Sequence, residues 1–395
     1  MRVYLDHNAT TPVDPDVLDA MQPFFSDAYG NASSMHSVGQ HARAAVDAAR
    51  DSVARLIGAK PSEIVFTSGG TEADNLAILG LIDSARAGSV ARPHLITTAI
   101  EHHAVLNAAQ HAAKRGIDVT FVSAPASGIV DPEEIRAALR PETFLISVMH
   151  ANNELGTIQP IEEIARVAED ADIHFHTDAV QSAGKLPLDV RNLGVDLLTL
   201  SAHKVYGPKG VGALFVRSGT PIAPQMFGGH HERDRRPGTE NVPAIVGFGR
   251  AAELAAQHLA NEDELTRITR LRDKLEHEIF AAVPGARVNG DPHLRVANTT
   301  NLSFDGVPGE AFVIALDLLG ISVSTGAACS SGAIEPSHVL RAIGLTDGQA
   351  ESSIRFSLGR STTAPEIDYV IEKVKATVER MRNLSPTHTT PASLR

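Results

Sequence analysis

Short β-rich segments alternate with helical segments between about residues 60 and 220, and this alternation constrains the fold more than any other feature. Seven segments combine short apolar runs with β-branched or aromatic residues: EIVFTS, HLITTA, DVTFVSA, TFLISVMH, IHFHTDAV, DLLTLSA and GALFVR. Segments between them, such as PEEIRAALR and IEEIARVAEDA, place apolar residues at helical spacing. Such alternation is typical of a mostly parallel sheet covered by helices. We therefore predict an α/β fold whose larger domain contains a mostly parallel seven-stranded sheet.

The pattern changes near residue 247, where a long Ala- and charge-rich segment indicates one long helix or two. After it come the strand-like RVANTTNLSF, the helical GEAFVIALDLLG, the strand-like SSIRFSLG and a last helix near 365–382. We predict a large domain over residues 13–260 and a smaller α+β domain over 261–395. Residues 1–12 could pack on either domain, and we assign them to the smaller one.

Charge and composition narrow the functional classes. The net charge of −12 argues against binding nucleic acid or an anionic membrane over the whole surface, although a local basic patch stays possible. No run of 18 apolar residues is present, and MRVYLDHNATTP lacks the apolar core of a secretory signal. The single cysteine excludes an intrachain disulfide and a CxxC metal site. We expect a cytoplasmic protein without membrane or nucleic-acid partners.

That single cysteine, Cys329, lies in the segment SVSTGAACSSGAIEP at residues 322–336. Its small and polar neighbours suit a mobile loop, whereas free cysteine is more often buried in a core. The composition alone leaves a structural thiol and a reactive one as alternatives.

The first motif that suggests chemistry is FTSGGTEADNL at residues 66–76, where a strand enters a glycine-rich turn and then a helical segment. Gly70 and Thr71 would offer backbone N–H groups and a hydroxyl at a helix N-terminus, which suits a phosphate. The spacing matches neither the Walker loop nor GxGxxG. Taken alone, the motif is explained better by a tight turn with Thr71 as N-cap, and a nucleotide-binding protein is the weakest alternative.

Two further motifs follow predicted strands. In FHTDAVQSAGK, Asp178 ends an apolar strand and Gln181 comes three residues later; in LLTLSAHKVYGPKG, a strand ends in Ser201, followed by His203 and Lys204. Ligands of open α/β sheets bind at the carboxyl ends of strands. An acid there can pair with a cationic ring nitrogen, and a partly buried lysine can form a Schiff base with an aldehyde. The simpler explanations are a helix-capping Asp178 and a solvated Lys204.

One ligand explains all three motifs together. A phosphate-binding turn, a strand-end carboxylate and a strand-end lysine are what pyridoxal 5′-phosphate requires. The aldehyde condenses with the lysine, and the carboxylate keeps the pyridine nitrogen protonated.

At this point the chain resembles the cysteine desulfurases of the NifS/IscS type, in the class V aminotransferase superfamily. The resemblance covers nearly the whole chain and rests on ten motifs in order: YLDHNATTPVDP, GNASSMHSVG, SGGTEADNLAI, EHHAVLNA, HANNELGTIQPI, HTDAVQSAGK, SAHKVYGPKGVGAL, RRPGTENV, STGAACSSG and SSIRFSLGR. It implies the pyridoxal-phosphate fold type I. Pro237 and the Ala327-Ala328 pair replace the more usual Ala and Ser-Ala, and neither change removes a reactive group.

The resemblance also implies roles for individual residues where the motifs match. Lys204 binds the cofactor covalently, His102 stacks on its ring and transfers protons, and Cys329 accepts the sulfur. The other roles concern the cofactor and substrate: Asp178 pairs with the pyridine nitrogen, Gln181 with the ring hydroxyl oxygen, Gly70, Thr71, Ser201 and His203 with the phosphate, Thr239 with the phosphate of the other subunit, and Asn153 and Arg355 with the substrate carboxylate. Asn153 also counts among the cofactor contacts.

The implied reaction converts L-cysteine to L-alanine and leaves a persulfide on Cys329. Implied partners are a second copy of the chain and a sulfur acceptor, such as an iron–sulfur scaffold or a tRNA-thiolation relay protein. We expect no metal of the protein's own, since GGHHERDRR lacks a clear ligand set and reads as a polar loop near a dimer interface. In a partner complex Cys329 could contact an iron–sulfur cluster. The alternatives are a selenocysteine lyase, an aminotransferase of the same fold, or a non-catalytic scaffold subunit.

Overall fold

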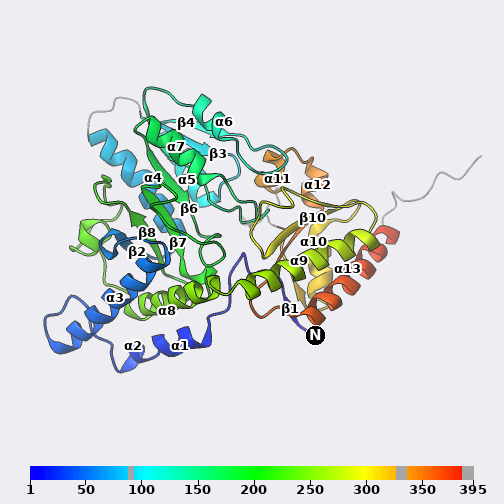
Figure 1. Cartoon of the computed structure of the whole chain (residues 1–395), viewed down its shortest axis with the longest axis horizontal. Helices are drawn as coiled ribbons and strands as arrows, with labels where there is room; N and C mark the ends of the chain where they lie inside the picture. Colours follow the sequence, from blue (N-terminus) through cyan, green and yellow to red (C-terminus); the bar gives the residue numbers. More distant parts are fainter. Residues whose placement is uncertain (88–92, 326–335, 385–395) are drawn as a thin grey trace, which may run out of the picture.

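The computed structural model describes residues 1–87, 93–325 and 336–384. Figure 1 shows a larger unit, built on a twisted sheet with helices on both faces, beside a smaller unit that carries the last helix. No helix in these described ranges is both long and apolar enough to cross a membrane.

The large sheet has the strand order β2-β8-β7-β6-β5-β3-β4, and β8 runs antiparallel to both its neighbours while the other pairs are parallel. Each strand lies inside one of the seven predicted segments: β2 (Ile64–Thr67), β3 (His94–Thr98), β4 (Asp118–Val122), β5 (Thr143–Ser147), β6 (His174–Asp178), β7 (Leu197–Ser201) and β8 (Gly212–Val216). The predicted α/β class with a mostly parallel sheet is therefore confirmed.

Helices cover both faces of this sheet. Each strand except the edge strand β4 is therefore buried along nearly its whole length. One apolar cluster joins one face to the helices α3 (Ser37–Leu56), α6 (Pro132–Ala137), α7 (Ile161–Asp170) and α8 (Val242–Leu259). A second cluster joins the other face to α4 (Gly70–Ala87) and α5 (His103–Lys114). Shorter elements complete this unit: α1 (Pro15–Met21), α2 (Pro23–Ser26) and the 3₁₀ turns η1 (Pro61–Glu63), η2 (Ala202–Lys204) and η3 (Glu232–Asp234).

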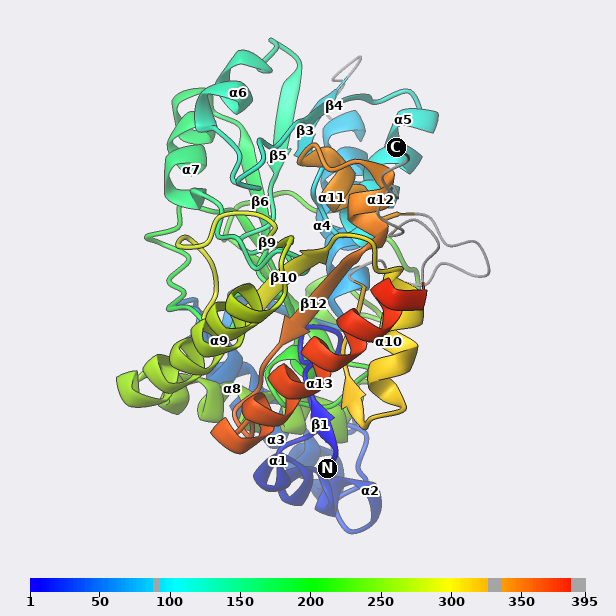
Figure 2. The ribbon, with the colours of Figure 1, turned by 90° about the vertical axis from the view of Figure 1, so that its right-hand side faces the viewer.

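The smaller unit contains a three-stranded antiparallel sheet in the order β12-β10-β9, with β9 (Ala286–Val288), β10 (Thr299–Phe304) and β12 (Ser353–Ser357). The helices α9 (Glu262–Ala282), α10 (Gly309–Asp317) and α13 (Ala364–Leu384) share an apolar cluster with it. Figure 2 shows α13 beside β12, with α9 to its left and α10 to its right. The long segment after residue 247 is thus two helices, α8 and α9.

The N-terminal segment packs on this smaller unit. Its strand β1 (Val3–Tyr4) pairs in parallel with β11 (Ile321–Ser322), and Val3 and Leu5 belong to the smaller unit's apolar cluster. The helices α11 (His338–Ala342) and α12 (Asp347–Glu351) instead contribute Val339, Leu340 and Ala350 to the larger cluster. The chain therefore returns to the larger unit after residue 336, and the proposed boundary at residue 260 stays a prediction.

A buried ion pair ties the loop before α8 to the large unit. Arg50 donates two hydrogen bonds of 2.7 Å to the carboxylate of Glu232, and both side chains are buried. The same carboxylate accepts the backbone N–H of Phe66 in β2 at 3.0 Å. The segment GGHHERDRR, read from sequence as a polar loop, is therefore anchored in the interior by its glutamate.

We expect Glu232→Gln to lower the free energy of unfolding by about 3–5 kcal/mol, because it leaves the buried Arg50 guanidinium without its counter-charge. Denaturation in urea measures the change. Glu133→Gln is the matched control, since its pair with Arg136 is exposed to solvent and should cost less than about 1 kcal/mol. Equal losses in the two variants would contradict the assignment.

Candidate active site

A cavity of about 460 Å³ opens at the carboxyl ends of β6 and β7, where the N-terminal segment and β12 reach the large unit. It brings together ten of the twelve residues predicted from sequence: Gly70, Thr71, His102, Asn153, Asp178, Gln181, Ser201, His203, Lys204 and Arg355. Their separate roles stay predictions. Their convergence from distant parts of the sequence is a property of the fold.

The two remaining predicted residues lie elsewhere. Thr239 is exposed in the loop before α8 and is not among the residues that line the cavity. Its predicted contact with the other subunit stays a prediction. Cys329 lies outside the described residues.

The N-terminus of α4 and the end of β7 form the end of the cavity where we predict the phosphate to bind. Gly70 starts α4 and a Cβ there would meet Val180 Cγ2 at 3.0 Å, so a larger residue would crowd the wall of the cavity. Burial, followed by the charge of Lys204, lowers the pKa of His203 to about 4, and its Nδ1 contacts Thr10 Oγ1 at 3.1 Å. A neutral His203 would therefore bind a phosphate through a hydrogen bond while the helix N-terminus supplies N–H groups.

His102 and Asp178 occupy the middle of the cavity. His102 caps α5, and its Nδ1 accepts the backbone N–H of Ala104 at 3.1 Å. Burial and the positive charge of Lys204 lower its pKa to about 4, so the ring is neutral near pH 7. Asp178 accepts the N–H of Val180 at 2.8 Å, and burial raises its pKa to about 6. A cation beside Asp178 would favour its ionised form, as a protonated pyridine nitrogen requires.

Lys204 lies on the turn η2, directly after β7. Its Nζ donates to the carbonyl oxygens of Asn8 at 2.5 Å and Ala9 at 2.8 Å. Burial, and then the charge of Arg355, lowers its pKa to about 8. The amine is therefore far easier to deprotonate than a solvated lysine, as a nucleophile or base near neutral pH must be.

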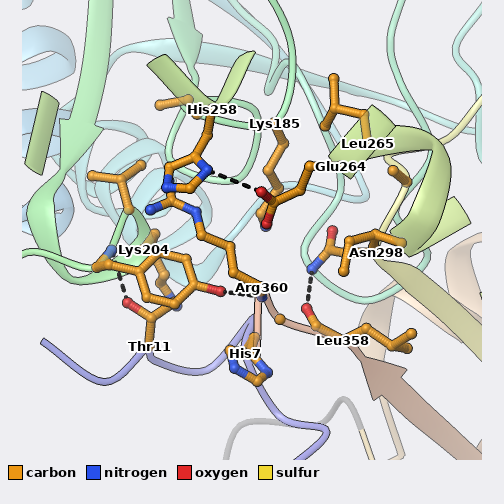
Figure 3. Close-up of a pocket in the computed structure, with 17 residues that line it drawn as sticks. His7, Thr11, Lys185, Lys204, His258, Glu264, Leu265, Asn298, Leu358 and Arg360 are labelled. Atoms are coloured by element: carbon orange, nitrogen blue, oxygen red, sulfur yellow. Dashed lines mark hydrogen bonds and ion pairs between the residues drawn. The ribbon is translucent and has the colours of Figure 1, made fainter. Parts of the chain in front are cut away.

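Lys204 also lines a second, smaller cavity of about 70 Å³, together with His7 and Thr11 of the N-terminal segment. Figure 3 shows this second cavity, with Lys185, His258, Glu264 and Arg360 around it. His258 Nδ1 lies 3.2 Å from Glu264 Oε2, and the guanidinium of Arg360 stacks on Tyr206 with 4.3 Å to the ring centroid.

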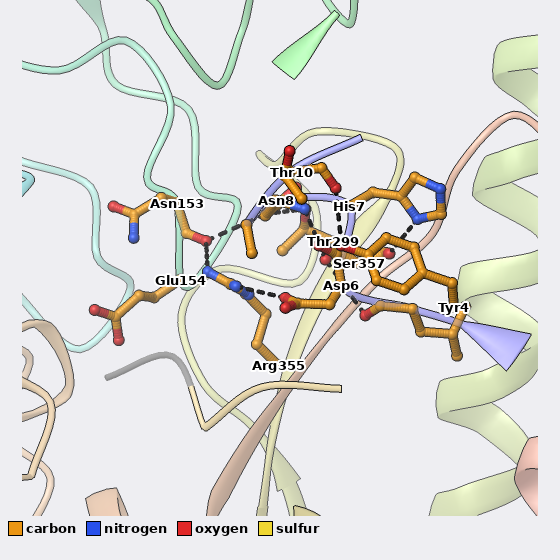
Figure 4. A network of polar contacts seen from close by, with 12 residues as sticks. Tyr4, Asp6, His7, Asn8, Thr10, Asn153, Glu154, Thr299, Arg355 and Ser357 are labelled. Carbon is orange, nitrogen blue, oxygen red and sulfur yellow. Dashed lines mark hydrogen bonds and ion pairs between the residues drawn. The ribbon is translucent and has the colours of Figure 1, made fainter. Parts of the chain in front are cut away.

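Arg355 dominates the opposite end of the active cavity (Figure 4). Its Nη1 donates to the carbonyl oxygen of Asn153 at 2.8 Å, and its Nη2 donates to Asp6 Oδ1 at 2.7 Å. Its buried Nε and the buried Oδ1 of Asn153 have no hydrogen-bond partner among the described residues. Unpaired buried polar atoms are costly. The Nε–H of Arg355 can donate to a carboxylate, whereas Asn153 Oδ1 is an acceptor and would need a donor, so this end of the cavity suits a ligand that carries both kinds of group.

Sequence reasoning missed two buried acids of this cavity. Asp74 lies one helical turn after Gly70, and burial and the charge of Asp178 raise its pKa well above the usual value. Glu154 accepts a 2.5 Å hydrogen bond from Ser337, and burial raises its pKa to about 7. Helical spacing in SGGTEADNL could have indicated Asp74, since residues four apart share a helix face.

The cavity fits pyridoxal phosphate on the chemistry of its side chains. It offers an amine of lowered pKa, a buried carboxylate, a neutral imidazole and a helix N-terminus, with unpaired polar atoms at the far end. Each of these groups matches one part of the cofactor or of an amino-acid substrate.

Comparison with known proteins agrees with the predicted family and cofactor. The chain matches the family described as Aminotransferase class-V over residues 3–370. The chain belongs to this family. Aminotransferase class-V enzymes of this kind depend on pyridoxal phosphate, so the predicted cofactor is confirmed, as is the resemblance inferred from the ten motifs.

Two curated relatives match this chain over nearly their whole length. A protein named Cysteine desulfurase IscS from Dictyoglomus turgidum is 48% identical over 97% of this chain and 96% of its own. A Cysteine desulfurase from Nostoc sp. is 50% identical over 97% of this chain and 94% of its own. Among solved structures, one titled NIFS-LIKE PROTEIN is 38% identical, covers 96% of this chain and 100% of its own, and has a TM-score of 0.89.

Asp178→Asn tests the carboxylate of the cavity. We expect turnover of substrate to fall roughly 100- to 1,000-fold, because the amide leaves a buried cationic nitrogen without its counter-charge. Steady-state kinetics with saturating cofactor measures the loss. Asp172→Asn, at an exposed position with φ of +54°, should leave turnover unchanged. Full activity in the Asp178 variant would contradict the predicted pairing.

Proposed function

We propose that the protein is a pyridoxal-phosphate-dependent cysteine desulfurase that converts L-cysteine to L-alanine and transfers the sulfur to Cys329. One observation carries this proposal: ten residues predicted from separate motifs line a single cavity. The near full-length identity to proteins named cysteine desulfurase supports the choice of substrate.

Each residue of the cavity has a task in this reaction. Bound pyridoxal phosphate supplies an electron sink for the negative charge that remains when a proton leaves the substrate Cα. Lys204 holds the cofactor and then carries the proton, which its lowered pKa permits. Asp178 holds a proton on the ring nitrogen, and His102 covers the ring. Gly70, Thr71, Ser201 and His203 bind the phosphate.

The substrate carboxylate binds to Arg355, whose buried Nε–H has no partner among the described residues, and to the Nδ2 donor of Asn153. The Cys329 thiolate forms a bond to the substrate sulfur while the carbon–sulfur bond breaks. The carbon keeps the electron pair of that bond and takes up a proton, which gives alanine. The sulfur stays on Cys329 as a persulfide, so atoms and electrons balance without an added oxidant or reductant.

The persulfide then passes to an acceptor protein in the cytoplasm. An iron–sulfur scaffold is the favoured acceptor, because the spacing between STGAACSSG and SSIRFSLGR resembles that of desulfurases with a long loop. A tRNA-thiolation relay protein is the alternative. A homodimer would add Thr239 of one subunit to the phosphate site of the other.

Product analysis tests the proposal. Purified protein loaded with pyridoxal phosphate and given L-cysteine with a thiol should release alanine and sulfide in equal amounts. A selenocysteine lyase would act on selenocysteine and leave cysteine untouched, and an aminotransferase would consume a keto acid without releasing sulfide. Either result would overturn the proposal, as would a protein that binds no pyridoxal phosphate.

A further inference from the structure

We propose that Lys185 is a positioning residue that fixes the side-chain amide of Gln181 so that an N–H group is offered to the active cavity. The inference rests on the proposed function and assigns a task to a residue outside the predicted set. It concerns the wall between the active cavity, lined by Gln181, and the second cavity, lined by Lys185 (Figure 3).

The hydrogen bonds allow only one orientation of the Gln181 amide. Gln181 Oε1 accepts from Lys185 Nζ at 2.8 Å, and Gln181 Nε2 donates to the carbonyl oxygen of Asn8 at 2.9 Å. A backbone carbonyl can only accept and a lysine ammonium can only donate, so exchanging the amide oxygen and nitrogen would break the bond to Asn8 at any pH and the bond to Lys185 while its amine is charged. The chemistry of the partners therefore fixes the assignment.

One N–H of Gln181 has no acceptor among residues 1–87, 93–325 and 336–384. Nε2 carries two hydrogens, and one is used by Asn8. Gln181 is itself buried and lines the active cavity. It can therefore donate to an anionic oxygen on the cofactor ring but cannot offer it a repelling carbonyl.

The surroundings of Lys185 differ from those of an ordinary surface lysine. Its Nζ also donates to Asn8 Oδ1 at 3.1 Å, so both of its partners are amide oxygens. The cations Lys204 and Arg355 face Lys185 from the active cavity. The charge of Lys185 in turn helps to lower the pKa of His7, after the larger effect of burial. Burial, and then these two cations, lower its pKa to about 7. Since the neutral amine also donates N–H, the bond to Gln181 persists on both sides of neutral pH.

The fixed amide has a measurable consequence for the bound cofactor. A hydrogen bond to an ionised oxygen lowers the pKa of that oxygen, and losing the bond raises it. Without Lys185, the bond to the Asn8 carbonyl is the one described bond that still orients the amide, so a larger share of the molecules can present the amide carbonyl to the cavity. The pH midpoint of the visible absorbance of the bound cofactor should then rise.

The experiment titrates the absorbance of the loaded protein against pH and measures the dissociation constant of pyridoxal phosphate. Lys185→Met, which cannot donate, should raise the midpoint by about one pH unit and weaken cofactor binding roughly tenfold. Lys185→Arg keeps a donor, and the second cavity beside it has room for the longer side chain. We expect its midpoint to stay near that of the wild type.

A double variant separates positioning from direct charge. In a Gln181→Ala background, Lys185→Met should change the acid dissociation constant that the midpoint reports by less than about twofold. The amide through which Lys185 acts is absent from that background. A full tenfold shift in that background would overturn the proposal, as would a wild-type midpoint in the single Lys185→Met variant.

Gln181→Glu provides a second route if Lys185→Met does not fold. It keeps Lys185 and gives it a carboxylate partner but removes the N–H donor. The midpoint should therefore rise by at least about one pH unit, which is a tenfold change in the acid dissociation constant. A wild-type midpoint in Gln181→Glu would overturn the proposal. Failure of the wild type to bind pyridoxal phosphate would instead overturn the proposed function, so the two failures are distinguishable.

Discussion

Replacing Lys204 with alanine is expected to abolish covalent attachment of the cofactor and to lower desulfurase turnover by at least about 1,000-fold. The variant removes the amine whose pKa is lowered to about 8, and with it the group that can both hold the cofactor and move a proton at Cα. Within the part of the chain that the structure describes, the hydrogen bonds of its Nζ go to the backbone carbonyl oxygens of Asn8 and Ala9, so the fold should tolerate its removal. Mass spectrometry after borohydride reduction measures the covalent attachment, and release of alanine measures the turnover.

Lys209→Ala is the matched control for this variant. Lys209 follows in the same loop and is exposed to solvent, so both the attachment and the turnover should stay at wild-type levels. If Lys204→Ala still formed a reducible bond to the cofactor, another lysine would hold it, and Lys185 would be the first candidate.

Replacing Cys329 with serine is expected to abolish the persulfide and to reduce the release of sulfur to background. A serine hydroxyl is not ionised near neutral pH and cannot attack the substrate sulfur as a thiolate does. Mass spectrometry of the protein after incubation with L-cysteine measures the added sulfur atom. Binding of pyridoxal phosphate should not change, because the residues that line the cofactor cavity are untouched.

The neighbouring Ser330→Ala variant controls for a disturbed segment and should keep wild-type activity. If Cys329→Ser delivered sulfur to an acceptor at the wild-type rate, the assigned role of this cysteine would be wrong. Because the chain contains one cysteine, no second thiol could replace it in that assay.

The large sheet could be predicted from the sequence because its strands are buried and read as short apolar runs. β6 and β7, for example, lie inside IHFHTDAV and DLLTLSA, and polar strand-end residues mark where they stop. The strands β1 and β11 could not be predicted in this way. They have two residues each, too few to show any periodicity, and they exist because distant segments pair.

In the active site, too, the residues with a local sequence signal could be predicted, and those defined by contacts between distant segments could not. Asp178, Ser201 and Lys204 come at or just after strand ends, and the carboxyl ends of parallel strands meet at one edge of a sheet. The bond between Lys185 and Asn8 joins residues 177 positions apart and has no local signal. Glu154 was missed for a similar reason, since its partner Ser337 lies 183 positions away.

The position of Asn8 has a consequence for the order of events during protein synthesis. Asn8 is among the first residues to leave the ribosome. Its backbone N–H donates to Ser357, and its side chain bonds to Asn298 and Thr299, which are all synthesised much later. Arg355 belongs to the same late strand. A chain that ends before residue 355 therefore lacks both Arg355 and the Ser357 partner of Asn8, so it cannot form this end of the cavity.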